Sequence, residues 1–194
     1  MKKIISAFDV ETAAREDASR AFLLANALKP HGSESLEELW ARAHDLGPTY
    51  ESLPSPLATL TRQDPPRGLR YASLSWELTD IDLTEVTVWP GMSGLPQEWT
   101  DGSVVDVAAR VIGEDLPNSA GRLAGLLRFV EQIETSDAVE WLTTLPLLIV
   151  PETLLHTRLL QPRQHWTLDD GCARSVALAI LGVSSVRVYA GKAV

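Results

Sequence analysis

A glycine turn that joins an extended segment to a helix constrains the fold of this chain more than any other feature. Residues 164–168 have the composition of a strand, and the run Asp169-Asp170-Gly171 forms a tight turn after them. The residues that follow are helical in composition up to Gly182, and residues 185–190 predict another strand. A strand, turn, helix and strand in direct succession predict a sheet with helices packed against it.

Helical and extended patterns alternate along the rest of the 194 residues. Helices are predicted over residues 12–28, 33–47, 103–113, 122–134 and 136–141, and strands over residues 71–78, 83–89 and 147–150. We expect the strands at 71–78 and 83–89 to pair through a turn at 79–82, and Ser136-Asp137 to cap the helix that follows. The predicted fold is α+β, a small mixed β-sheet with packed helices, preceded by a helical N-terminal segment.

Proline and glycine are concentrated in residues 48–70. Such residues interrupt regular structure and are typical of segments between domains. We therefore predict a linker at 48–70, with at most one short helix at 56–61. It would separate a helical segment, residues 1–47, from an α+β domain at residues 71–194.

Charge is distributed unevenly along the chain. The net charge is −9 and the isoelectric point is near 4.9, values that do not favour binding to duplex nucleic acid. Residues 1–70, 71–145 and 146–194 carry net charges of −1, −10 and +2. An anion-binding site is therefore expected in the C-terminal segment.

Composition also excludes several classes of protein. The chain has one cysteine, Cys172, so an intramolecular disulfide and a multi-cysteine zinc site are both excluded. No apolar run approaches the roughly 18 residues of a membrane span, and residues 1–9 do not resemble a secretory signal. We expect a cytoplasmic protein with no membrane partner.

The turn predicts a binding site for an anion. A glycine before a helix lets the backbone approach a ligand, and the unpaired N–H groups of the first turn attract negative charge. An arginine adds a forked donor that suits phosphate or carboxylate. The predicted ligand-binding residues are Gly171, Cys172, Ala173 and Arg174. The alternative is a helix capped by an aspartate, with a solvated or salt-bridged arginine.

The order and spacing of these residues resemble the ParB/sulfiredoxin-like superfamily (ParB N-terminal domain-like). The resemblance is close over residues 145–192 and loose over 71–194. It is carried by Leu145-Pro146-Leu147-Leu148-Ile149-Val150, Trp166-Thr167-Leu168-Asp169-Asp170-Gly171-Cys172-Ala173-Arg174, Ala177-Leu178, Gly182 and Val186-Arg187-Val188-Tyr189. The resemblance implies a small mixed sheet and, as in several members, a nucleotide bound through the glycine turn and the arginine.

One departure from the family pattern bears on catalysis. Ala173 stands where the family commonly has histidine, so the imidazole that would contact phosphate or shuttle a proton is absent, which weakens the prediction of an enzymatic transfer. His156 or His165 could compensate for that missing imidazole. Cys172 occupies the position of the sulfiredoxin nucleophile, and a helix N-terminus with Arg174 nearby would lower the pKa of its thiol. Asp169 and Asp170 oppose this effect, and a small side chain that simply packs beneath the turn is the alternative.

The two aspartates also suggest a magnesium site. Asp169 and Asp170 could bind Mg²⁺ together with the phosphates of a nucleotide, since magnesium usually takes one or two carboxylates. Adjacent residues of a strand point to opposite faces, so only one of the two carboxylates could face a given ligand.

Two functions are compatible with the sequence. The first is a regulatory or non-catalytic protein that binds a nucleotide or another phosphate-bearing small molecule. The alternative is a non-enzymatic protein interaction module with a degenerate ligand site. In that case the N-terminal helices, whose apolar edge contains Leu36, Leu39 and Trp40, would form a homo-oligomer or bind a protein partner.

Overall fold

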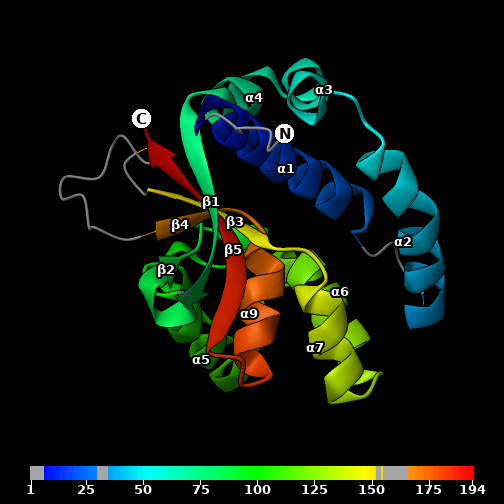
Figure 1. Cartoon of the computed structure of the whole chain (residues 1–194). Coiled ribbons are helices and arrows are strands. Elements are labelled where there is room, and N and C mark those ends of the chain that lie inside the picture. The colour runs from blue at the N-terminus through cyan, green and yellow to red at the C-terminus, as the bar shows by residue number, and fades with distance from the viewer. Residues whose placement is uncertain (1–6, 30–34, 152–153, 155–165) are drawn as a thin grey trace.

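The chain folds into a mixed β-sheet covered by helices on both faces (Figure 1). The computed structural model describes residues 7–29, 35–151, 154 and 166–194. The α-helices are α1 (Ala7–Ala27), α2 (Leu36–Glu51), α3 (Pro56–Gln63), α4 (Pro65–Ala72), α5 (Val104–Gly113), α6 (Gly121–Glu131), α7 (Thr135–Thr143) and α9 (Cys172–Ile180). The strands are β1 (Leu74–Asp82), β2 (Val86–Thr87), β3 (Leu147–Pro151), β4 (Trp166–Asp170) and β5 (Ser185–Ala193). The predicted α+β class with a small mixed sheet is confirmed.

Strand order in the described sheet is β1-β5-β3-β4-β2. β5 pairs antiparallel with β1 and parallel with β3, and β4 pairs antiparallel with β3 and parallel with β2. The predicted hairpin between residues 71–78 and 83–89 is therefore wrong. β1 and β2 lie at opposite edges of the sheet, because each finds its partner among the C-terminal strands.

β3 is buried on both faces, as its unbroken apolar sequence requires. Leu147 and Ile149 pack into the larger core, on the face covered by α5, α6, α7 and α9. Leu148 and Val150 pack into the smaller core, beneath α1, α3 and α4. The alternation of side chains along a strand thus divides the core into two layers.

The proline-rich segment 48–70 is largely helical, although the sequence predicted a linker with at most one short helix. α2 continues through Pro48. α3 and α4 each begin with proline in the first turn, where a backbone N–H would have no acceptor within the helix. Ser55 and Asp64 cap these two helices through their side chains. The short helix predicted at 56–61 corresponds to α3.

The cap predicted for α7 is wrong. Glu134 is its N-cap residue, and no side-chain cap forms there among the described residues. Ser136 and Asp137 lie inside the first turn of the helix. The helix itself is present, because Ala138, Trp141 and Leu142 are buried on one of its faces.

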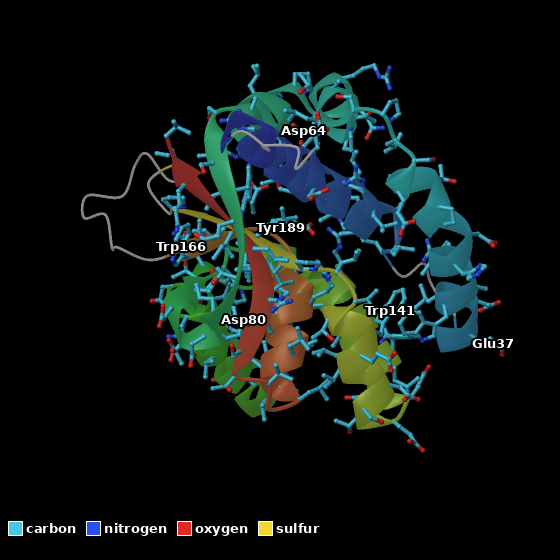
Figure 2. All side chains as sticks on the ribbon, in the orientation of Figure 1. Glu37, Asp64, Asp80, Trp141, Trp166 and Tyr189 are labelled. Atoms are coloured by element: carbon cyan, nitrogen blue, oxygen red, sulfur yellow. The ribbon has the colours of Figure 1, made fainter. Side chains whose placement is uncertain are left out.

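The N-terminal helices pack on the rest of the chain. Leu28 and Leu39 belong to the larger buried cluster, and Phe22 belongs to the smaller one. The ring of Trp40 meets that of Trp141 edge to face, with centroids 5.1 Å apart, where α2 approaches α7 (Figure 2). Leu39 and Trp40 thus pack within their own chain, and the side chain of Leu36 lies outside the described residues. Assembly through these helices stays a prediction.

A buried carboxylate joins the helical layer to the sheet. The side chain of Asp169 on β4 has no exposed surface. Its Oδ2 accepts hydrogen bonds from Arg67 Nε at 3.0 Å and from the Tyr71 hydroxyl at 2.6 Å, and its Oδ1 accepts one from Arg70. The three donors come from α4, so one side chain fixes that helix against the strand.

Asp169→Asn should lower the free energy of unfolding by about 3–5 kcal/mol, because it leaves the largely buried Arg70 without its counter-charge and leaves Arg67 with Asp64 alone. Asp80→Asn is the matched control. The Asp80–Arg187 ion pair is 62% exposed on both sides, so its loss should cost less than about 1 kcal/mol. Urea denaturation measures both values, and equal losses would contradict the assigned role of Asp169.

Candidate functional site

The turn between β4 and α9 has a geometry that requires glycine. Gly171 has φ of 92° and ψ of 16°, in the left-handed region. A Cβ atom at this position would lie 2.4 Å from Cδ2 of Leu147. Among the described residues no side chain caps α9, so the aspartate cap considered above does not form. The N–H groups of the first turn therefore have no side-chain partner from that part of the chain.

Arg174 is held across the turn. Its Nη1 donates to the carbonyl oxygen of Leu145 at 2.9 Å, and its Nη2 lies 3.5 Å from Oδ2 of Asp170. Burial lowers the pKa of the guanidinium, while Asp170 acts in the opposite direction. An arginine remains charged despite such a shift, so the turn carries a fixed cation beside the helix N-terminus.

The surroundings of Cys172 do not favour the thiolate form that a nucleophilic cysteine requires. Burial raises the pKa of its thiol to about 12, and the charges of Asp170 and Asp169 act in the same direction. Hydrogen bonds with the backbone of Trp89 and of Cys172 lower the pKa of the thiol but do not overcome these effects. These surroundings favour the alternative given above, a small side chain that packs beneath the turn, and the thiol is protonated at neutral pH.

The predicted magnesium ligands Asp169 and Asp170 both face arginines, and magnesium binding at Asp170 stays a prediction. Both oxygens of Asp169 accept hydrogen bonds from arginines or tyrosine, which leaves that carboxylate unable to bind a cation. Asp170 faces Arg174. No group of three or more His, Cys, Asp or Glu residues suited to a metal ion occurs in the described part of the chain. His156 and His165 lie outside that part.

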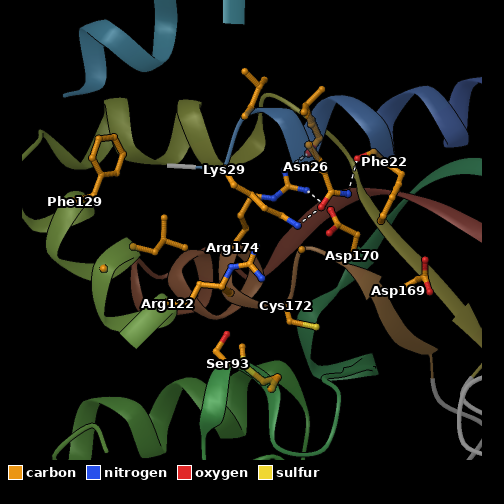
Figure 3. Close-up of a pocket in the computed structure, with 18 of the residues that line it drawn as sticks. Phe22, Asn26, Lys29, Ser93, Arg122, Phe129, Asp169, Asp170, Cys172 and Arg174 are labelled. Atoms are coloured by element: carbon orange, nitrogen blue, oxygen red, sulfur yellow. Dashed lines mark hydrogen bonds and ion pairs between the residues drawn. The ribbon is translucent and has the colours of Figure 1, made fainter. Parts of the chain in front are cut away.

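All four predicted ligand residues, Gly171 to Arg174, line one cavity of about 630 Å³. The wall opposite them includes the C-terminal end of α1 and Lys29, which follows that helix. α6, the end of α7 and the loop that contains Met92 and Ser93 complete the cavity (Figure 3). The turn is therefore one side of a space that several distant segments enclose.

Cationic side chains outnumber acidic ones around the cavity. Among the described residues, five cations line the wall: Lys29, Arg67, Arg122, Arg128 and Arg174. The acidic residues in the same part of the wall are Asp169 and Asp170, and each already faces an arginine. The cavity wall thus has an excess of positive charge.

The cavity wall is positively charged, although the chain as a whole is negatively charged. Residues 71–145 contain thirteen acidic and three basic residues, the latter being Arg110, Arg122 and Arg128. Two of the three basic residues line the cavity, and none of the thirteen acidic residues does. The segment with the most negative charge therefore contributes only positive charge to the cavity wall.

Four of the five cations, Lys29, Arg67, Arg122 and Arg128, were not predicted from the sequence. They come from the end of α1, from α4 and from α6, which no sequence pattern connects to the glycine turn. For α6, the distribution of basic residues in the sequence could have indicated the site. Basic residues are rare in residues 71–145, and two of the three fall within the eleven residues of that helix.

Native Cys172 should react with iodoacetamide at pH 8 on the order of a thousandfold more slowly than the unfolded chain, because a pKa near 12 leaves little thiolate. The native rate should also keep rising with pH up to about 10. Mass spectrometry of timed samples measures both rates. A native rate that levels off between about pH 7 and pH 9 would contradict the buried, protonated thiol.

The part of the chain that the structure describes contains no helix both long and apolar enough to cross a membrane. In comparisons with known proteins, no family model, no curated protein and no solved structure matches this chain. The resemblance to the ParB/sulfiredoxin-like superfamily therefore stays a prediction.

Proposed function

We propose that this protein binds a small phosphate-bearing molecule, a nucleotide or another organic phosphate, in the cavity at the N-terminus of α9. The observation that carries the proposal is the excess of cationic side chains around that cavity in a chain of net charge −9. Like charges that face one cavity repel one another unless an opposite charge compensates them. A bound phosphate would supply that charge.

Other cations of the cavity repel the ammonium group of Lys29. Burial lowers the pKa of its ammonium group, and the positive charges of Arg122, Arg67 and Arg174 lower it further, against the opposing effect of Asp170. Figure 3 shows Lys29, Arg122 and Arg174 directed toward a common space. An anion in that space would contact three cations from separate segments and would meet the N-terminal end of α9.

The size of the cavity suits an organic phosphate. A volume of about 630 Å³ falls within the range of roughly 300–1,000 Å³ that small-molecule sites occupy. Leu126, Phe129 and Trp141 supply apolar wall beside the cations. A ligand with a charged phosphate and a less polar body would use both parts of the surface.

Arg122→Ala should remove at least about half of the thermal stabilisation that ATP or glycerol 3-phosphate gives to the intact chain, since one charged contact is worth about tenfold or more in affinity. At a ligand concentration of about 100 times Kd, binding adds about 2.7 kcal/mol and should raise the Tm by about 5–10 °C. Arg122 is exposed on α6, so its loss should leave the fold intact. Differential scanning fluorimetry, with and without Mg²⁺, measures the shift.

Arg187→Ala is the matched control, since it removes the same charge from an exposed site on β5. It should retain the full ligand-induced shift. If inorganic phosphate, ATP and glycerol 3-phosphate all leave the Tm of the unaltered protein unchanged, the proposal is wrong. If Arg122→Ala and Arg187→Ala lose the shift equally, the ligand binds elsewhere.

Phosphate affinity should weaken as the pH rises from about 7 to 10, because Lys29 loses its positive charge as the pH passes its lowered pKa. Lys29→Arg keeps a permanent cation at this position and should remove that part of the pH dependence. Isothermal titration calorimetry with glycerol 3-phosphate at several pH values measures the effect. Identical pH profiles for the two proteins would contradict the contact with Lys29.

A further inference from the structure

One of the cations in the cavity differs from the others in its chemistry. The chain has four lysines and thirteen arginines, and Lys29 is the one lysine among the described residues of the cavity wall. Lys192 lies on the surface and pairs with Glu77 at 2.6 Å, while Lys2 and Lys3 precede the described residues. Arginine stays protonated in proteins, but a lysine can lose its proton and become a nucleophile.

The amine of Lys29 is oriented by the last turn of α1. Its Nζ donates a hydrogen bond to Oδ1 of Asn26. Nδ2 of Asn26 in turn donates to the carbonyl oxygen of Phe22 at 3.0 Å, so the amide oxygen is directed toward the lysine (Figure 3). The amine is thereby held at the cavity instead of moving freely in solvent.

The surroundings of Lys29 favour the neutral amine more than solvent does. The charged groups that act on it are Asp170 of β4, Arg122 of α6, Arg67 of α4 and Arg174 of α9. Burial has the largest effect and favours the neutral amine, as do the three arginines, while Asp170 favours the charged form; the pKa of Lys29 is lowered as a result. A partly desolvated lysine beside other cations is a recognised setting for imine chemistry.

We propose that Lys29 forms an imine with the carbonyl group of a phosphate-bearing aldehyde or ketone whose phosphate contacts the arginines of the cavity. This inference rests on the proposed phosphate binding and adds a reactive carbonyl to the ligand. The nitrogen lone pair attacks the carbonyl carbon to form a C–N bond, and the carbonyl oxygen takes up protons. That oxygen then leaves as water while the nitrogen loses both of its hydrogens, so the step requires no oxidant or reductant.

Reductive trapping tests the imine. The intact protein is incubated with sodium cyanoborohydride and either glyceraldehyde 3-phosphate or glyceraldehyde, and the modified lysines are identified by peptide mass mapping. The phosphate-bearing aldehyde should modify Lys29 at least about tenfold faster than glyceraldehyde, as expected from one additional charged contact. Lys192 should react slowly and equally with both, and glycerol 3-phosphate should protect Lys29.

The variant Lys29→Arg separates this inference from the proposed binding. It should give no trapped adduct in the cavity, yet glycerol 3-phosphate should still raise its Tm. A Tm shift in the unaltered protein without any Lys29 adduct would overturn the imine and leave phosphate binding intact. Equal modification of Lys29 by both aldehydes, with no Tm shift, would overturn phosphate binding and the proposed ligand together.

Discussion

The enclosed carboxylate of Asp169 is the constraint on which the rest of the site depends. It fixes α4 against β4 through Arg67, Arg70 and Tyr71. The next residues along the chain form the glycine turn and the first turn of α9. A strand that is anchored to the helical layer therefore positions the helix N-terminus that faces the cavity. Burial makes this network costly to break, because Arg70 would lose its counter-charge and Arg67 would keep only Asp64.

The cavity shows how a strongly acidic chain maintains a cationic site. Its basic residues come from the end of α1 and from α4, α6 and α9, which are distant in sequence and meet only in the folded chain. The acidic residues of the middle segment are excluded from its wall. Local charge and net charge are thus separate properties of the fold, and the first governs what the site attracts.

Local sequence patterns predicted where helices and strands form better than they predicted which strands pair with each other. The run from Leu147 to Val150 indicated a buried strand, and the position of Gly171 indicated a strand followed by a helix, because both depend on neighbouring residues. The pairing of β1 with β5 could not be predicted, since periodicity does not identify the partner of a strand. Lys29 was missed for the same reason, because its place in the cavity depends on how α1 packs. Burial of Cys172, which raises the pKa of its thiol, is likewise a property of the folded chain.

The position of β5 in the sheet has a consequence for the order of folding. β5 lies between β1 and β3 and pairs Leu74 with Ala193 at one end of its ladder. During synthesis, β1 therefore emerges long before its partner strand exists. Contacts between segments so distant in sequence slow folding, and the unpaired edge of β1 stays open to other chains until β5 arrives.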